Sequence, residues 1–468
     1  MDENLPIRSS LIPRPAVLSR ILAVGVLLAC SGTGLAAAPG PHFVIFLSDD
    51  HGQKDSTPYG ATDVRTPNMR ALADAGCVFT QAFVASPSCA PSRAAMLTGL
   101  MPARNGAEAN HTYKKDGIAS LPDALRGLGY ETAAFGKVAH GPDDARRHGF
   151  DHVDRNHASR AVAEYLARRD SRKPLALFVG TPEPHVPWAA VDGYDPSRVV
   201  LPDTSVDTPV TREFRARYYT DVTRADAELG EIRALARKTF GDSAVFLYTS
   251  DHGAQWPFAK WNLYDAGIQV PLIVEWPGVV KPGTTSDALV QWIDLLPTLI
   301  EIAGGTAPQS LDGRSFAKVL RGEAATHRDR VFATHSGDGN MNVTPMRCLR
   351  KEGFKYILNL YPSHEYGTHI DRGPVPDRDG VPYWDSWVQA ARTDPDAAAV
   401  VKRYRERPPE ELYDLAADPT ERRNLAADPR HAARLVASRE ELERWMREQG
   451  DSRAFFGKPT TSPSQVKD

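Results

Sequence analysis

The chain has 468 residues, a formal net charge of −3 and 41% hydrophobic residues. This length predicts one large domain with an appendage, or two domains, and the near-balanced charge argues against nucleic acid as a partner. The four cysteines, Cys30, Cys77, Cys89 and Cys348, are too few for a disulfide scaffold. Cys77 and Cys348 could form a pair or remain two free thiols.

Residues 1–38 have the pattern of an export signal. A positive start with Arg8, Arg14 and Arg20 precedes the apolar run 21–29, which is too short to span a bilayer. Ala36, Ala37 and Ala38 provide a small-residue cleavage site. The stretch Leu27-Leu28-Ala29-Cys30 also resembles a bacterial lipoprotein cleavage box, which would leave a lipid anchor on Cys30. Either route predicts a bacterial protein outside the cytoplasm: periplasmic, extracellular or anchored to a membrane.

Residues 39–325 alternate short apolar runs with amphipathic stretches, which predicts an α/β domain. The expected strands are 43–47, 132–135, 175–179, 244–248 and 270–276. Helices are expected between them, one capped by Thr66, one capped by Ser120 and a later one, 295–303, capped by Asp294. The pattern indicates a large, mostly parallel sheet flanked by helices.

Polar side chains follow several of these strands at their carboxyl ends, where ligands bind in open α/β sheets. They are Asp49, Asp50, Lys137, His140, His185, Asp251 and His252. The adjacent carboxylates of Asp49 and Asp50 would repel each other unless a cation lay between them, and hard divalent cations prefer such oxygen ligands. The alternative is a pair of solvated turn aspartates before Gly52. Because Asp251 leaves another strand in the same way, we expect a metal site.

The stretch Ser88-Cys89-Ala90-Pro91-Ser92-Arg93 combines a nucleophile with features that attract anions. Pro91 suits the first position of a helix, so Cys89 should lie at a helix N-terminus, where backbone N–H groups and the helix dipole favour negative charge. Arg93, one turn further, has a fork of donors that fits sulfate or phosphate. The alternative, a buried free cysteine beside a capping turn, is disfavoured by these neighbours.

Cys89-Ala90-Pro91-Ser92-Arg93, followed by Leu97-Thr98-Gly99 and Pro102, resembles the signature of the formylglycine-dependent (type I) sulfatases. The resemblance extends from about Pro41 to about Asp428. It implies an alkaline-phosphatase-like sandwich fold. It also implies that formylglycine-generating machinery converts Cys89 to 3-oxoalanine (formylglycine), whose aldehyde hydrate is the nucleophile.

The resemblance further implies one calcium ion per chain, held by Asp49, Asp50, Asp251 and His252 with the modified Cys89 facing it. Many family members have Asn where this chain has His252, and imidazole suits softer metals better than calcium. The fourth ligand and the identity of the metal are therefore left open.

Five further residues acquire roles from the resemblance. Arg93 and Lys137 would contact the sulfate, and His140 would hydrogen-bond to the formylglycine hydrate. His185 would approach the leaving oxygen, and Lys260 would hold a sulfate oxygen or share the acid role. The Gly-Lys-x-x-His spacing of Lys137 and His140 is the variant found in iduronate-type sulfatases.

Residues 326–450 are predicted to form a smaller α+β subdomain with an antiparallel sheet, including strands 331–334 and 356–360. Residues 411–415 resemble the closing segment of sulfatases, and 430–449 form an amphipathic helix. Residues 451–468 are a tail, with disorder expected over 458–468. In the loop 334–347, His335, Asp338 and Arg347 are candidates to hold the substrate, although Arg347 could equally brace the interface between the two parts.

The segments 255–264, 345–347 and 411–414 resemble the N-sulfoglucosamine sulfohydrolase (sulfamidase) branch of the family and its bacterial relatives. They imply a sulfated carbohydrate substrate, such as an N-sulfated glucosamine. Other interpretations remain open: an O-sulfated sugar sulfatase or aryl sulfatase, or a phosphodiesterase or phosphonate monoester hydrolase of the same superfamily. A non-catalytic protein that binds sulfated glycans is the alternative if Cys89 stays unconverted.

Overall fold

The computed structural model describes residues 40–170, 172–372, 381–454 and 456. The predicted export signal and the predicted disordered tail, 458–468, lie outside these residues. The described residues form one compact unit. No helix among the described residues combines the length and the apolar character needed to cross a membrane.

An eight-stranded sheet has the order β5-β4-β6-β1-β7-β8-β2-β9. Its strands are β1 (His42–Ser48), β2 (Cys77–Phe79), β4 (Glu131–Gly136), β5 (His152–Asp154), β6 (Leu175–Gly180), β7 (Ala244–Ser250), β8 (Leu272–Glu275) and β9 (Thr284–Ser286). The central strand β1 pairs in parallel with both β6 and β7. The mostly parallel sheet is thus confirmed, but β8 runs antiparallel to β7 and β2.

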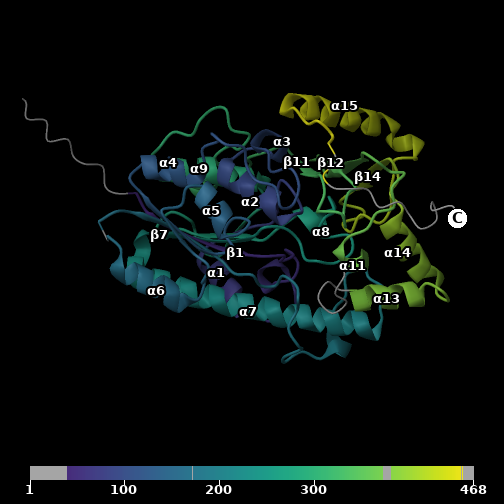
Figure 1. Ribbon diagram of the computed structural model, residues 1–468, viewed down its shortest axis with the longest axis horizontal. Helices are drawn as coiled ribbons and strands as arrows, with labels where there is room; N and C mark the ends of the chain where they lie inside the picture. The colour runs from purple at the N-terminus through teal and green to yellow at the C-terminus, as the bar shows by residue number, and fades with distance from the viewer. Residues whose placement is uncertain (1–39, 171, 373–380, 455, 457–468) are drawn as a thin grey trace, which may run out of the picture. The chain divides into compact units, whose positions relative to one another are not determined.

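Helices cover both faces of this sheet. They are α1 (Pro67–Ala75), α2 (Cys89–Thr98), α3 (Pro102–Asn105), α4 (Leu121–Gly127), α5 (Pro142–Arg147), α6 (Ser159–Arg168), α7 (Pro209–Phe240), α8 (Asp265–Ile268), α9 (Leu295–Ile302) and α10 (Ala317–Leu320). Figure 1 shows α2, α4, α5 and α9 on one side of β1 and β7, and α1, α6 and α7 on the other. Successive side chains of a strand point to opposite faces, and two separate cores result.

The two cores divide the residues of β1 between them. Phe43 and Ile45 pack in the core that includes residues of α2 and α9. Val44 and Phe46 pack in the opposite core, with residues of α1 and the C-terminal half of α7. Burial on both faces explains why this strand is a continuous apolar run in the sequence.

A separate antiparallel sheet has the order β11-β12-β13-β14, which confirms the predicted C-terminal sheet. Its strands are β11 (Arg330–His335), β12 (Met346–Lys351), β13 (Phe354–Asn359) and β14 (Glu410–Asp414). Glu352 and Gly353 join β12 to β13, both with positive φ, as a two-residue hairpin turn requires. Helix α15 (Ala432–Gln449) packs Leu442 and Met446 against this sheet (Figure 1).

The remaining elements belong neither to the two large sheets nor to the helices named above. They are β3 (Ala82–Phe83), β10 (Val290–Gln291), α11 (His369–Arg372), α13 (Val381–Ala390), α14 (Pro395–Arg405), and the 3-10 helices η1 (Thr57–Tyr59), η2 (Pro196–Arg198), η3 (Gly241–Ser243), η4 (Trp292–Asp294) and η5 (Pro429–His431). Cys77 and Cys348 are both buried free thiols.

Three local predictions need correction. Helix α2 begins at Cys89, with Ser88 at the N-cap, two residues earlier than Pro91 suggested. Thr66 occupies the N-cap position of α1 without capping it, because its hydroxyl accepts from the Thr57 N–H. Asp294 precedes α9, but its carboxylate accepts from Arg328. At Asp294, pairing with Arg328 thus takes the place of the local capping contact.

Candidate active site

The carboxyl ends of β1 and β7 bring the predicted metal ligands together. Candidate ligand atoms of Asp49, Asp50, Cys89, Asp251 and His252 all lie within 4.8 Å of one another, and all five residues are buried. Asp50 has a φ of 66°, and its N–H donates to Asp251 Oδ1 over 3.0 Å. The predicted convergence of these residues is what parallel neighbouring strands produce.

Cys89 is the first residue of α2, as expected for a side chain at a helix N-terminus. Its Sγ lies 3.2 Å from His252 Nε2, 3.6 Å from Asp49 Oδ1 and 3.7 Å from Lys137 Nζ. Burial raises the pKa of the Cys89 thiol well above its ordinary value. The unmodified side chain is therefore a poor nucleophile, because the thiolate is the reactive form.

Helix α2 is anchored to the cluster by its first turn. Ser92 Oγ donates to the Asp251 carbonyl over 2.6 Å. Arg93 donates through Nε to Asp251 Oδ2 over 2.9 Å and through Nη2 to Asp49 Oδ1 over 3.3 Å. Arg93 is fully buried, so its fork of donors holds two carboxylates in fixed positions.

The three carboxylates of this cluster offer the oxygen ligands that a hard divalent cation prefers, and His252 adds one nitrogen ligand. Asp50 Oδ1 is buried and receives no hydrogen bond from any described residue, and burial raises the pKa of Asp251 despite the neighbouring Arg93. His252 Nδ1–H donates to the Gly253 carbonyl over 3.0 Å, which leaves Nε2 as the lone-pair atom 3.4 Å from Asp50 Oδ1. A cation among these oxygens would satisfy the orphaned atom, and a second hydrogen bond of this kind commonly orients a ligating histidine.

Cationic side chains surround the three carboxylates of this cluster. Lys137 pairs with Asp49, and Lys260 Nζ donates to Asp50 Oδ2 over 2.6 Å. Burial favours the neutral form of Asp49, but Lys137 and Arg93 outweigh it and hold the pKa of Asp49 well below its ordinary value. The three positive charges balance the three carboxylates, so an added divalent cation would make the site attractive to an anion.

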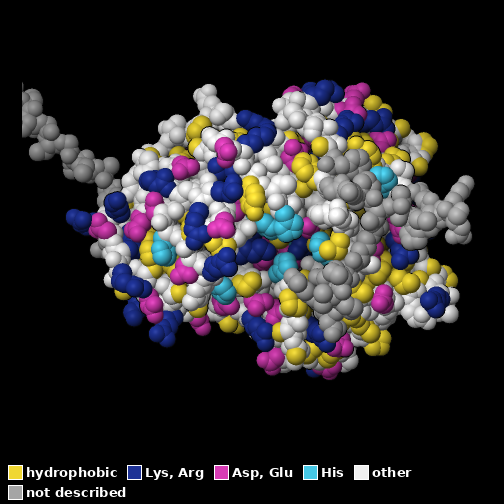
Figure 2. Space-filling view, viewed as in Figure 1, with side chains coloured by type: hydrophobic (Ala, Val, Ile, Leu, Met, Phe, Trp, Pro, Cys, Tyr) yellow, Lys and Arg dark blue, Asp and Glu magenta, His cyan; other side chains and the backbone are white. Residues whose placement is uncertain are grey.

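Two histidines lie at this site as partly exposed side chains. His185 Nδ1–H donates to the Val186 carbonyl over 2.6 Å, and its Nε2 lies 3.9 Å from Asp50 Oδ2. Burial, reinforced by the charge of Lys260, lowers the pKa of His185 to about 4. Burial and Lys137 lower the pKa of His140 to about 3. Figure 2 shows histidine side chains gathered with Lys or Arg near the middle of one face.

The structure adds residues that sequence reasoning missed. His140 Nε2 lies 2.8 Å from His111 Nδ1, and His111 Nε2 lies 3.4 Å from Asp338 Oδ1. Asp338 Oδ2 accepts from Trp261 Nε1 over 2.7 Å and from Asn110 Nδ2 over 3.0 Å. His111 and Asn110 follow no predicted strand, so no sequence signal marked them.

The other candidate substrate residues are buried. Arg347 lies in β12 rather than in a loop, is 1% exposed and pairs with Asp451. Its Nη1 donates to the His335 and Met346 carbonyls. These contacts match the bracing role considered for Arg347. His335 is fully buried.

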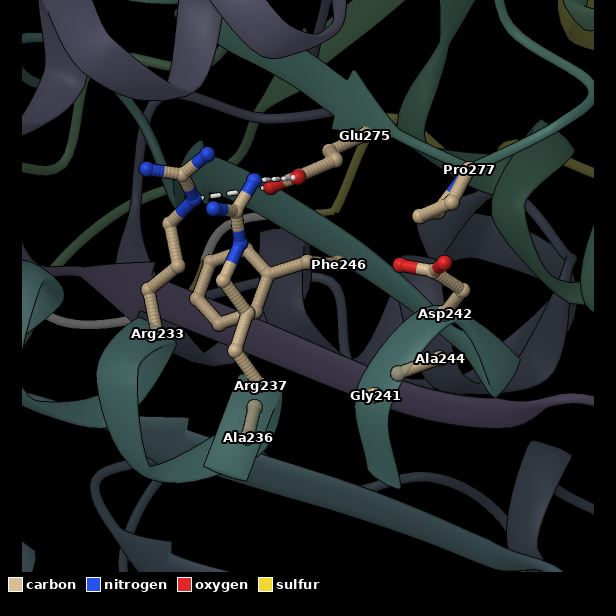
Figure 3. A pocket seen from close by; sticks show the side chains of 9 residues that line it. All are labelled: Arg233, Ala236, Arg237, Gly241, Asp242, Ala244, Phe246, Glu275 and Pro277. Carbon is tan, nitrogen blue, oxygen red and sulfur yellow. Dashed lines mark hydrogen bonds and ion pairs between the residues drawn. The ribbon is translucent and has the colours of Figure 1, made fainter. Parts of the chain in front are cut away.

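A different hollow lies at the amino end of β7, beside Ala244, at the opposite end of that strand from Asp251. Arg233 Nε donates to Glu275 Oε2 over 2.7 Å, and Arg237 also pairs with Glu275 (Figure 3). Asp242 adds a second carboxylate to its lining. Both oxygens of Glu275 are therefore engaged by arginines. Among the described residues of the lining there is no Ser, Cys or His that could act as a nucleophile.

Comparison with known proteins gives consistent matches. The family model "Sulfatase" matches residues 41–165 and 159–305, and the model "N-sulphoglucosamine sulphohydrolase, C-terminal" matches 252–377. An ulvan-active sulfatase of Formosa agariphila is 30% identical over 92% of this chain and 84% of its own length. Human N-sulphoglucosamine sulphohydrolase is 28% identical over 89% of this chain and 92% of its own length.

Solved structures share the fold. One, described as a complex with its substrate D-glucosamine-2-N,6-O-disulfate, has a TM-score of 0.66 and 19% identity, covering 88% of this chain and 99% of its own. The phosphonate monoester hydrolase of Agrobacterium radiobacter has a TM-score of 0.68 and 18% identity, covering 87% of this chain and 96% of its own. At these identities the likeness concerns the fold alone.

Proposed function

Because this chain belongs to the sulfatase family and is a sulfuric ester hydrolase, we propose that it hydrolyses sulfate esters or sulfamates of a sulfated glycan and releases inorganic sulfate. It does so with a formylglycine made from Cys89 and with calcium. The observation that carries the proposal is the position of Cys89 at the start of α2, within reach of His252, Asp49 and Lys137.

Asp49, Asp50, Asp251 and His252 would hold the cation. When bound, it would supply a Lewis acid that polarises a sulfate oxygen, and the converted residue 89 would supply a hydroxyl nucleophile. The chain's own cations, Arg93, Lys137 and Lys260, stabilise charge that develops on the sulfate oxygens. This division of roles follows from their positions around the same carboxylates.

Of the two acids considered for the leaving group, His185 and Lys260, Lys260 is the proton donor, because a pKa lowered to about 4 leaves His185 unprotonated at neutral pH. Although burial opposes its charge, Asp50 raises the pKa of Lys260, so this side chain holds its proton at neutral pH. His185 presents Nε2 toward the cluster because its Nδ1–H is committed to the Val186 carbonyl. His140 would accept the proton of the remaining hydroxyl on residue 89 when sulfate departs.

The identity of the sulfated sugar is a separate part of the proposal. The similarity of residues 252–377 to the C-terminal region of N-sulphoglucosamine sulphohydrolase favours an N-sulfated glucosamine. The 30% identical ulvan-active sulfatase favours a sulfated polysaccharide of another kind. The phosphonate monoester hydrolase fold keeps phosphonate esters as the second candidate class.

A panel assay tests these alternatives. Protein produced with the converting machinery is offered glucosamine 2-N-sulfate, an O-sulfated glucosamine, 4-nitrophenyl sulfate and a phenyl phosphonate ester, and the released anion is measured. We expect sulfate release, with the N-sulfated sugar preferred. Release from the phosphonate ester alone would contradict the sulfatase assignment for this site, and release from O-sulfated sugars alone would reject only the sulfamidase branch.

The mass of the peptide that contains Cys89 separates catalysis from simple glycan binding. A converted residue has lost its sulfur, and we expect that form in active protein. The matched control is Cys77→Ala, in which Cys89 should still be converted. Cys77 is also a buried free thiol, but it lies in β2.

We also propose export through residues 1–38, and the mass of the mature N-terminus distinguishes cleavage after Ala38 from lipidation at Cys30.

A further inference from the structure

His111 links His140 to a buried carboxylate. Its Nδ1 lies 2.8 Å from His140 Nε2, and its Nε2 lies 3.4 Å from Asp338 Oδ1. The backbone of His111 has a φ of 63°, a conformation that residues other than glycine adopt rarely and at a cost. The side chain of Asp338 is 3% exposed, whereas that of His111 is 65% exposed. Asp338 is therefore held in place by its burial, whereas His111, which lies between Asp338 and His140, reaches solvent.

Asp338 can only accept hydrogen bonds from its surroundings. Its Oδ2 already takes the Trp261 Nε1–H and the Asn110 Nδ2–H. Burial favours the protonated acid, but the hydrogen bond from His111 and nearby positive charges keep the pKa of Asp338 below its ordinary value. Because Asp338 is a carboxylate, the proton between it and His111 must lie on His111 Nε2.

This proton sets the tautomers of both rings. A neutral His111 with a proton on Nε2 has a lone pair on Nδ1, so it accepts from the Nε2–H of His140. His140 is then left with an unprotonated Nδ1. That nitrogen is buried and has no hydrogen-bond partner in the described residues. A buried, unpartnered lone pair at the site is what a proton acceptor needs.

We propose that His111 and Asp338 are positioning residues that hold His140 as a base and conduct its proton to solvent. The inference rests on the proposed function in one respect, that His140 receives a hydroxyl proton when sulfate departs. His140 Nδ1 takes that proton, and His140 Nε2 passes its own to His111 Nδ1. The resulting imidazolium of His111 is paired with Asp338, and one proton then leaves to water. Two protons are passed on in sequence, the net result is that one proton goes from residue 89 to water, and no electrons are exchanged.

The charges around the two rings favour this direction of transfer. Asp338 raises the pKa of His111, while burial, Lys137 and Lys260 act in the opposite direction. At His140, burial and the charges of Lys137 and Arg93 disfavour the cation, and Asp49 favours it. A positive charge therefore rests more stably on His111 than on His140.

Nitrogen-15 NMR of the histidine rings tests the hydrogen-bond pattern in protein with unconverted Cys89, so its result is independent of turnover. We expect His140 to be protonated on Nε2 in the wild-type protein. In Asp338→Asn the amide carbonyl stays with Trp261 and Asn110, and its NH₂ group faces His111 Nε2. The direction of both hydrogen bonds, between residue 338 and His111 and between His111 and His140, should then reverse, with His140 protonated on Nδ1. The matched control is Asp144→Asn, because Asp144 Oδ2 accepts from the backbone N–H of His140 rather than from its ring. It should leave the tautomer unchanged.

Kinetics of converted protein provide the second measurement, with 4-nitrophenyl sulfate as the probe. We expect His111→Ala to lose about tenfold to a hundredfold in kcat, and added imidazole to restore part of it because position 111 is open to solvent. A merely structural role would not respond to imidazole. An unchanged His140 tautomer in Asp338→Asn, or a full kcat in His111→Ala, would overturn the relay. A wild-type protein that shows the expected tautomer but releases no sulfate would instead refute the proposed function and leave the hydrogen-bond assignment standing.

Discussion

Replacing Arg347 by Ala should destabilise the protein strongly. Arg347 and Asp451 both have side chains that are 1% exposed, and Arg347 Nη2 donates to Asp451 Oδ1 over 2.9 Å while Nε also contacts this carboxylate. The substitution leaves Asp451 buried, with the Arg453 N–H as its remaining donor among the described contacts. Breaking a buried pair by removing one partner costs about 3–5 kcal/mol. We expect a loss of that size in the free energy of unfolding.

Urea unfolding of wild-type and variant protein measures this loss. Arg453→Ala is the matched control, because Arg453 is 49% exposed and lies 3.8 Å from the partly exposed Glu443. Exposed pairs contribute about 0–1 kcal/mol, so the control should stay close to the wild type. A loss below about 1 kcal/mol in Arg347→Ala would refute the reasoning from burial.

The pH dependence of the same measurement has a defined sign. Burial opposes ionisation of Asp451, but the hydrogen bonds and charge of Arg347 outweigh it and lower the pKa of Asp451 in the folded state. A lowered pKa stabilises the fold above the unfolded-state value of about 4, and this contribution is lost as the pH falls through the folded-state pKa. The difference between wild type and Arg347→Ala should therefore shrink below about pH 4.

Activity distinguishes the two roles considered for Arg347. A bracing residue should affect turnover of a glycan and of 4-nitrophenyl sulfate equally. A selective loss on the glycan would instead indicate that Arg347 contacts remote groups of the substrate, because binding energy from such groups helps to orient the reacting centre.

Three other outcomes are expected. Cys89→Ala should abolish turnover and keep the unfolding transition of the parent; turnover of an aryl sulfate at the parental rate would exclude Cys89 as the nucleophile. Elemental analysis of desalted, active protein should find one divalent cation, and calcium at a hundred times its dissociation constant should stabilise the metal-free protein by about 2.7 kcal/mol; full activity in a strong chelator would contradict the metal site. Gly180→Ala should lower both stability and turnover, since an added Cβ would lie 2.2 Å from the Lys137 carbonyl oxygen, whereas Gly127→Ala, with open space around it, should be neutral or stabilising; equal behaviour of the two variants would refute this packing argument.

The sequence alone predicted the main sheet and the cluster at its edge. The run 43–47 is apolar because both faces of β1 are buried, and such runs are visible in any window of the sequence. Asp49 and Asp251 each end a strand, and neighbouring parallel strands end at the same edge of the sheet. A local pattern and one topological rule were therefore sufficient to bring these residues together.

Contacts that depend on long-range docking were not predictable in this way. The direction of β8, the strand character of Arg347 and the pairing of Asp294 with Arg328 are decided by neighbours that are remote in sequence. Local propensity describes a residue's preference, and burial of a charge overrides that preference when a partner from another element is present.

The candidate site shows the same division. Sequence patterns marked Cys89, the carboxylates and most of the cations of this candidate site, because each of these stands in a recognisable stretch. Only the tertiary structure places Asn110 against Asp338, 228 positions away along the chain, and Arg347 against Asp451, 104 positions away. These side chains lie in stretches without strand or helix periodicity or are paired across separate elements. Their partners come from segments that are remote in sequence and are brought together by the folding of the whole chain, which no local spacing encodes.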